Sequence, residues 1–244
     1  MISIVLNVYK RHYVLEKQIE AIKNQSIPIE GKDIHVWYNK SDMAQYYPKD
    51  GDINTYTCNW HTKFFGRFTI PLLMRTPFVA VFDDDTIPQK DWLKNCMETI
   101  EKPESNGILG GSGVILSERK YSAQEKVGWN GQQLDVAKRV DLVGHAWFFR
   151  QEWAKYLWYE KPYTWDNGED IMFSYLTQKY GGINTFVPPH PKSNKDLWSS
   201  DSKTGLEYGN DANASWTKRP HFGERDGVCN HCIDNGWKTV RNIK

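Results

Sequence analysis

The fold is decided by the stretch Phe78-Val79-Ala80-Val81-Phe82-Asp83-Asp84-Asp85, in which five apolar residues are followed directly by three aspartates. An uninterrupted apolar run of this length is typical of a strand that other elements cover on both faces. Strands of this kind build parallel sheets, and open α/β sheets bind their ligands at the carboxyl ends of the strands. The stretch therefore predicts an α/β protein with a site that begins at Asp83.

The flanking sequence repeats the alternation of strands and helices that builds a parallel sheet. Apolar residues are continuous over 2–8 and 34–38, which predicts strands, and are spaced as in a helix over 12–24. Further strands are expected at 53–58, 107–116, 140–149 and 185–187, and helices at 64–74, 91–100 and 171–180. Because residues 191–244 show no strong period, we expect one main domain over 1–190 and a C-terminal extension, 191–244, packed on it.

Composition disfavours two kinds of partner. Lys and Arg number 31 against 30 Asp and Glu, so the chain lacks the basic excess that binding to a nucleic-acid backbone needs. No stretch approaches the roughly 20 apolar residues that span a bilayer, and the segment 1–8 lacks the basic leader of a signal peptide. We therefore expect a soluble, cytoplasmic protein with no nucleic-acid partner and no transmembrane segment.

The three aspartates indicate a divalent metal ion. Like charges crowded at the end of a strand repel each other, and a cation removes that cost. Alternate side chains of an extended chain share a face, so Asp83 and Asp85 can converge on one ion while Asp84 points elsewhere. Carboxylate oxygens favour Mn²⁺ or Mg²⁺. The alternative is a solvated turn, because Asp is common where strands end.

The order of four motifs resembles that of the GT-A glycosyltransferases, especially the small family 2 enzymes. The segment 3–9 resembles their first strand, and 82–85 resembles the DxD motif, whose acidic residues hold the metal on the donor diphosphate and contact the ribose. Residues 143–150 are similar to a glycine loop that precedes an arginine, and 168–170 are similar to the ED motif. The resemblance covers roughly residues 1–190 and, in its compact character, extends to glycosyltransferases encoded by large DNA viruses.

The resemblance implies a GT-A type, Rossmann-like nucleotide-binding sheet with helices on both faces. It also implies a Mn²⁺- or Mg²⁺-dependent hexosyl- or pentosyltransferase that uses a UDP- or GDP-linked donor and a carbohydrate or glycan acceptor. Asp170, the second carboxylate of the ED motif, is then the catalytic base of an inverting displacement. The expected metal ligands are Asp83, Asp85 and His190, with His221 in reserve. The other residues expected to bind substrate or nucleotide are Tyr9, Arg11, Asn39, Arg67, Asp83, Asp84, Gly144, His145, Trp147 and Glu169.

Tryptophan is abundant, with 11 residues, and most of these rings are expected in the core. Trp147, Trp165 and Trp198 lie beside the motifs and are the candidates to stack on sugar rings. Two other functions remain open. A sugar-phosphate nucleotidyltransferase would normally open with a glycine-rich phosphate loop, and residues 7–16 contain no glycine. A non-catalytic carbohydrate-binding module would explain the tryptophans but not the ordered acidic motifs.

Overall fold

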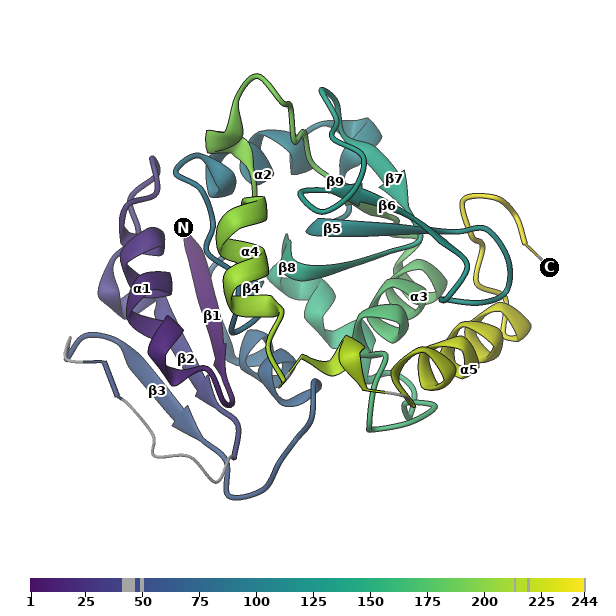
Figure 1. Cartoon of the computed structure of the whole chain (residues 1–244), viewed down its shortest axis with the longest axis horizontal. Helices are drawn as coiled ribbons and strands as arrows, with labels where there is room; N and C mark the ends of the chain where they lie inside the picture. Colours follow the sequence, from purple (N-terminus) through teal and green to yellow (C-terminus); the bar gives the residue numbers. More distant parts are fainter. Residues whose placement is uncertain (41–46, 49–50, 213, 219, 244) are drawn as a thin grey trace.

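The computed structural model describes residues 1–40, 47–48, 51–212, 214–218 and 220–243, and the strands within these ranges join in a single mixed sheet (Figure 1). The sheet runs in the order β3-β2-β1-β4-β8-β5-β9-β7, and β6 pairs with β5 beside this path. The strands are β1 (Ile2–Val8), β2 (Ile34–Tyr38), β3 (Asn54–Thr57), β4 (Phe78–Phe82), β5 (Ile108–Leu116), β6 (Gln124–Gly128), β7 (Lys138–Val140), β8 (Leu142–Arg150) and β9 (Thr185–Val187).

Helices connect these strands and follow them. The α-helices are α1 (Leu15–Lys23), α2 (Trp92–Ile100), α3 (Glu169–Gly181), α4 (Ser202–Gly209) and α5 (Pro220–Asp234). The 3₁₀ helices are η1 (His12–Val14), η2 (Gly31–Asp33), η3 (Gly66–Leu73), η4 (Pro103–Ser105), η5 (Gln151–Trp158), η6 (Lys195–Leu197) and η7 (Ser215–Thr217). No helix in the described ranges is both long and apolar enough to cross a bilayer.

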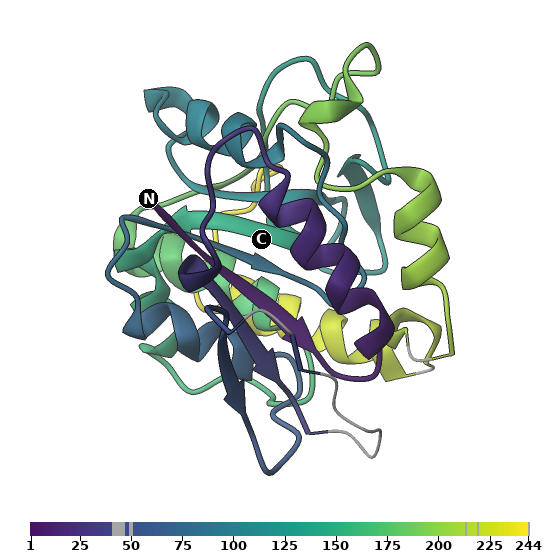
Figure 2. The same ribbon diagram turned by 90° about the vertical axis from the view of Figure 1, so that its left-hand side faces the viewer.

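The first four strands are parallel and contain a reversal of strand order. The chain steps outward through β1, β2 and β3 and then returns to β4, which pairs with β1. Because parallel crossovers are right-handed, α1 and η3, which connect strands in opposite directions, cover opposite faces of the sheet. Figure 2 shows α1 on one of these faces. The carboxyl ends of β1 and β4 therefore flank the switch point at which open α/β sheets bind ligands.

The second half of the sheet brings the ED motif to the same edge. β8 is antiparallel to β4, with Ala146 opposite Phe82, so the first half of β8 extends past the end of β4. α3 packs against β8 and begins at Glu169. Gly168, the residue before it, has φ +81°, and Val228 leaves no room for a Cβ at this position. Glycine therefore allows the ED motif to turn into the helix at this point.

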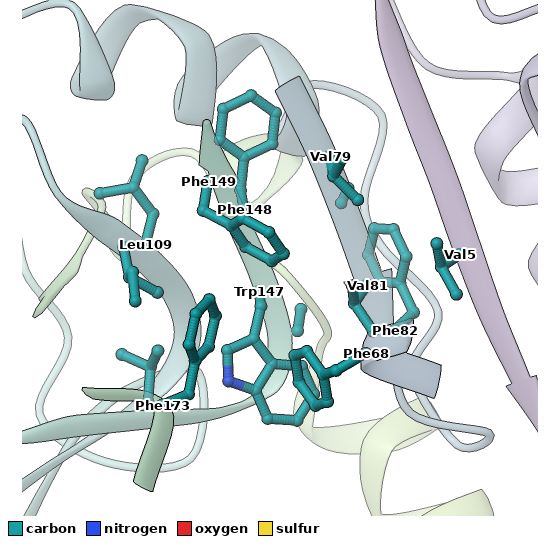
Figure 3. Packing of buried hydrophobic residues seen from close by; sticks show 14 of the residues in the cluster. Val5, Phe68, Val79, Val81, Phe82, Leu109, Trp147, Phe148, Phe149 and Phe173 are labelled. Atoms are coloured by element: carbon teal, nitrogen blue, oxygen red, sulfur yellow. The ribbon is translucent and has the colours of Figure 1, made fainter. Parts of the chain in front are cut away.

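Aromatic rings form much of the core around β8 (Figure 3). On one face of the strand, Trp147 packs edge-on against Phe68, with ring centroids 5.3 Å apart, and Phe149 packs against Phe173 at 5.1 Å. Phe148 points to the opposite face, because successive side chains of a strand alternate. β8 is thus anchored on both sides, which holds the residues at its start in fixed positions.

Several expected elements differ from the structure. The expected strand 140–149 is divided into β7 and β8 at Asp141, whose buried carboxylate accepts the amides of Leu116 and Val240 at 2.7 and 2.6 Å. The helix expected over 64–74 is the 3₁₀ helix η3, which contains Pro71. Asp91 is the N-cap of α2, but its side chain makes no capping hydrogen bond.

The segment after β9 contains more helix than its sequence indicates. α5 carries Gly223 and Gly227, which lower helix propensity. Burial of Val228, Cys229 and Cys232 on the side that packs against α3 outweighs this cost. The division of the chain into a catalytic domain over 1–190 and an extension stays a prediction.

Candidate active site

The aspartate triplet, Asp83–Asp85, lies at the switch point and is held by hydrogen bonds to the surrounding protein. The Asp83 amide donates to the carbonyl of His145 at 3.1 Å, and the Thr86 hydroxyl donates to the same carbonyl at 2.7 Å. From α1, the side-chain amide of Gln18 donates to the carbonyls of Asp83 and Thr86 at 2.7 and 2.9 Å. These fixed contacts argue against a solvated turn.

Two arginines neutralise the triplet only in part. Arg11, which follows β1, pairs through Nη1 with Asp84 Oδ1 at 2.6 Å and lies 3.6 Å from Asp85 Oδ2. Arg67, on η3, pairs with Asp83. Burial raises the pKa of Asp84 to about 6 and the pKa of Asp85 to about 7, and a neighbouring carboxylate adds to each shift. Asp85 therefore has the weakest cationic partner of the three.

His145 reaches Asp85 because of a bulge in β8. The φ of His145 is +72°, in the left-handed region, and the register between β5 and β8 shifts between Gly110 and Ser112. Such bulges redirect side chains next to functional sites. His145 Nδ1 lies 3.5 Å from Asp85 Oδ1, and the ring packs on Trp129 with centroids 4.7 Å apart. Burial lowers the pKa of His145 to about 4, so the imidazole is neutral near pH 7.

Asp83, Asp85 and His145 form a group that can hold a divalent cation. Within the described ranges, these residues each offer a ligand atom, and the three atoms lie within 4.8 Å of one another. Asp85 Oδ1 and His145 Nε2 are buried without a hydrogen-bond partner, which is costly for polar atoms that nothing binds. Two carboxylates with a neutral imidazole suit Mn²⁺ better than Mg²⁺, which prefers oxygen ligands.

His190, expected as the third metal ligand, lies outside this group. Its Nδ1 is 2.8 Å from the carbonyl of Pro188, and its Nε2 is 3.2 Å from the Ser199 hydroxyl. Both ring nitrogens are thus engaged, and the residue is fully buried. The ring of His190 is therefore held in the core, away from this group, and the histidine that lies with Asp83 and Asp85 is His145. His221, the reserve candidate, is also outside the group found among the described residues.

Arg67 connects the triplet to the ED motif. Its Nη2 lies 2.9 Å from Glu169 Oε1 while its Nη1 pairs with Asp83. The guanidinium lies over the indole of Trp147, 4.7 Å from the ring centroid. Trp147 is only 2% exposed, so it supports Arg67 and is not available to stack on a sugar, which corrects that expectation. Burial also raises the pKa of Glu169 to about 7, with the adjacent Asp170 adding to the shift.

Asp170 is held by an arginine of the C-terminal helix. Arg225 Nη2, on α5, lies 2.6 Å from Asp170 Oδ2, and its Nη1 lies 3.2 Å from Asn167 Oδ1. Asp170 Oδ1 accepts the amide of Ile171 at 2.9 Å. A Cβ added to Gly144, on β8, would meet only Asp170 Oδ2, at 3.8 Å. Oδ2 therefore borders open space at the start of β8.

The loops after β1 and β3 bring two aromatic rings together beside the carboxyl ends of these strands. The ring of Tyr9 stacks on His61, with centroids 4.3 Å apart and an interplanar angle of 11°. Asn39, expected to bind the nucleotide, is buried and engaged in local structure. Its Nδ2 donates to the carbonyl of Lys63 and its Oδ1 accepts the amide of Thr62, both at 2.8 Å. Asn39 thus shapes the loop that carries His61, and its role in nucleotide binding stays a prediction.

The end of α4 and the residues that follow it lie against the triplet. Asp211 accepts two hydrogen bonds from Arg11, at 2.7 and 3.2 Å. Gly209 is so close that an added Cβ would lie 2.9 Å from Asp85 Oδ2. Residues 209–211 therefore belong to the site, although the expected motifs end near residue 190.

Sequence analysis missed His61, Asp211 and Arg225 as residues of the site. Asp211 and Arg225 lie beyond the motifs, and the glycines of α5 weaken the helical pattern around Arg225. No pattern in the sequence pairs Arg225 with Asp170, because the pairing depends on how α5 docks on α3. For His61, the only signal is its place after β3, next to the carboxyl end of β2.

No protein-family model matches the chain, and no curated protein matches its sequence. Among solved structures, S. aureus TarS aligns with a TM-score of 0.51 at 15% identity, over 78% of this chain and 35% of that chain. A TarS structure of residues 1–349 gives a TM-score of 0.49 at 15% identity, over 78% and 58% of the two chains. The mannosyltransferase PcManGT from Pyrobaculum calidifontis, in complex with GDP-Man and Mn²⁺, gives 0.45 at 14% identity, over 80% and 58%.

The likeness to TarS concerns the fold. This chain spans 35% of the TarS chain, so the alignment covers a part of that protein. Together with the parallel half-sheet and its switch point, the likeness confirms the expected GT-A type, Rossmann-like α/β fold.

Proposed function

We propose that the chain is a metal-dependent glycosyltransferase that moves a sugar from a nucleoside diphosphate sugar to an acceptor hydroxyl with inversion of the anomeric centre. The observation that carries the proposal is that two consecutive residues of β8 contact the metal-binding group and the proposed base. His145 belongs to the metal-binding group, and the preceding residue, Gly144, borders Asp170. A cation site suited to a diphosphate therefore lies next to a carboxylate suited to an acceptor.

The donor nucleotide is assigned to the switch point. The stacked rings of Tyr9 and His61 supply an aromatic surface for a uracil or guanine base, and Asp84 is the carboxylate assigned to the ribose. Asp83, Asp85 and His145 would hold a divalent cation, Mn²⁺ by their donor set, which when bound neutralises charge on the departing diphosphate.

Arg67 lies between the aspartate triplet and the ED motif and holds one carboxylate of each. It holds Asp83 and Glu169 at once, so neither side chain has to move when substrates bind. Its cation also lies in a site with little solvent, where charges stabilise a departing anion more strongly than in water. Arg67 is therefore assigned to leaving-group stabilisation.

Asp170 is assigned as the base that accepts the acceptor proton. The acceptor hydroxyl donates to Asp170 Oδ2, which borders open space, and its oxygen attacks the anomeric carbon. As this bond forms, the bond from the anomeric carbon to the phosphate oxygen breaks, and its electron pair leaves with the nucleoside diphosphate. The proton ends on Asp170. A single displacement from the opposite side inverts the configuration, and Arg225 orients the carboxylate for it.

Turnover of nucleotide sugars tests this function. The purified chain is incubated with UDP- and GDP-linked hexoses and pentoses in the presence of Mn²⁺, and the released nucleoside diphosphate is measured. We expect release from at least one donor, slowly with water as acceptor, and no release after addition of a chelator. No release from any donor would contradict the function. A product that keeps the donor's anomeric configuration would contradict the single displacement.

A further inference from the structure

Exposed tryptophans are confined to the neighbourhood of the candidate active site. All 11 tryptophans lie in the described ranges, and three of them are largely exposed: Trp60 at 68%, Trp165 at 49% and Trp216 at 51%. Trp60 precedes His61, the stacking partner of Tyr9. An indole offers a large, rigid apolar face that a ligand can cover, and each of these rings belongs to a segment that borders the site.

Trp60 and Trp216 belong to the nucleotide side of the site. Trp216 Nε1 donates to the carbonyl of Gly209 at 3.3 Å, and Gly209 lies against Asp85. Trp165 differs from both because it lies on the loop that leads to Asp170. Its ring packs edge-on against Phe65, with centroids 5.1 Å apart. Because five residues span at most about 18 Å, Trp165 lies within that distance of the proposed base.

The surroundings of Trp165 are polar. The next residue, Asp166, is 62% exposed and pairs with Lys63 at 3.4 Å. Further along the loop, Asn167 Nδ2 donates to Glu224 Oε2 at 3.3 Å. One exposed indole face beside a carboxylate and an ammonium does not suit an alkyl chain, which needs a continuous apolar surface. A pyranose ring has an apolar face of C–H groups and a rim of hydroxyls, and both fit this arrangement.

We infer that Trp165 is the platform for a sugar ring of the acceptor, with Asp166 and Lys63 available to its hydroxyls. The inference rests on the proposed function and deepens it, since it identifies the acceptor as a carbohydrate and assigns its binding site. The sugar ring stacks on the exposed face of Trp165, and the reacting hydroxyl extends along the loop towards Asp170 Oδ2.

Acceptor-stimulated release of nucleotide tests the inference. With Mn²⁺ and a donor that the chain hydrolyses, methyl β-D-glucoside, methyl α-D-mannoside, methyl β-D-galactoside, cellobiose and maltose are added one at a time. We expect at least one to accelerate release of the nucleoside diphosphate. In Trp165→Ala, the KM for that sugar should rise about 3- to 10-fold, the loss that one aromatic contact predicts. The KM for the donor should change less than the KM for the sugar.

Matched variants separate stacking from folding. Trp165→Phe keeps an aromatic face and the contact with Phe65, so its KM for the sugar should lie between those of wild type and Trp165→Ala. Tyr159→Ala removes an exposed ring at the end of η5, outside the site, and should leave the KM unchanged. The inference is overturned if none of the sugars accelerates release, or if neither Trp165 variant changes the KM for the sugar. In either case, hydrolysis of the donor by the wild-type chain would still support the proposed function. If the wild-type chain neither binds nor hydrolyses any donor, the proposed function fails, and this inference fails with it.

Discussion

The aspartate triplet and the Glu169–Asp170 pair lie at the same edge of the sheet, but their charges are balanced differently. In the triplet, the arginine that lies within 4 Å of Asp85 among the described residues is Arg11, at 3.6 Å; the imidazole of His145 beside it is neutral, and one oxygen of Asp85 has no hydrogen-bond partner. In the pair, Asp170 has an arginine at 2.6 Å and a backbone amide at 2.9 Å. The triplet is therefore short of positive charge, whereas Asp170 is held in place by an ion pair.

This difference indicates how one sheet edge can serve two purposes. Among the described residues of the site, three arginines are shared by six carboxylates, namely Asp83, Asp84, Asp85, Glu169, Asp170 and Asp211. The deficit of positive charge is greatest at Asp85, which suits a site for a divalent cation. Asp170 needs no cation, because Arg225 fixes it with one oxygen towards open space.

Removal of Arg225 would break the balance at Asp170 and should have the largest effect. Arg225→Met leaves a buried carboxylate without its partner, so we expect the free energy of unfolding to fall by about 3–5 kcal/mol. Chemical denaturation measures this loss. The double variant Arg225→Met, Asp170→Asn removes both charges and should recover much of the stability. Equal stability of the single and double variants would show that the unpaired carboxylate of Asp170 is not the cause of the loss.

Asp170→Asn tests the chemical role of the pair. The amide keeps the size of the side chain but cannot take a proton, so we expect kcat to fall about 100-fold or more. Nucleotide affinity should stay at the wild-type value, because the donor site is on the triplet side. Asp234→Asn, an exposed position on α5, is the control and should keep full activity. Near-normal transfer by a folded Asp170→Asn chain would refute the assignment of the base.

His145 and His190 provide the sharpest comparison at the triplet. His145→Ala removes a proposed ligand and should weaken the Mn²⁺-dependent affinity for UDP or GDP by about tenfold or more, as measured by calorimetry. His190→Ala should lower the melting temperature, because a buried ring is lost, but leave that affinity unchanged. A loss of Mn²⁺-dependent affinity in His190→Ala but not in His145→Ala would identify His190 as the metal ligand.

Glu169 should give the protein a pH-dependent stability. Its pKa in the folded chain, about 7, is above its ordinary value of 4.5, so the folded state binds the proton more tightly than the unfolded state. The stabilisation is complete below about pH 4.5 and is lost as the pH rises through 7. The melting temperature of the wild-type chain should therefore fall by several degrees between pH 5 and pH 8. Glu169→Gln should make this fall smaller, and the exposed control Glu104→Gln should leave it unchanged. An unchanged fall in Glu169→Gln would show that another group causes it.

The sequence was sufficient to predict the features that depend on neighbouring residues. The strands expected at 2–8, 34–38 and 78–82 have these bounds in the structure, since continuous apolar runs fix them. The position of Asp83–Asp85 at the end of β4 follows from the same run. The role of Asp170 as a base stays a prediction, because geometry alone does not test it.

The features that sequence could not predict depend on long-range packing. The orientation of His145 follows from a β-bulge and a positive φ, and no pattern in the neighbouring sequence predicts either of them. Trp147 lies beside a motif but is buried, because it supports Arg67. The pairing of Arg225 with Asp170 joins residues 55 positions apart. Motifs therefore located the candidate site, while its charge balance could be described only from the structure.

Binding of nucleoside diphosphates with and without Mn²⁺ tests the central claim most directly. UDP and GDP are titrated into the wild-type chain by calorimetry, once with Mn²⁺ and once with excess chelator. We predict that at least one nucleotide binds in Mn²⁺ and that its affinity is lost with the chelator, because Asp85 and its neighbours repel the diphosphate when no cation is bound. Equal affinity under both conditions would contradict the account of the triplet as a metal site.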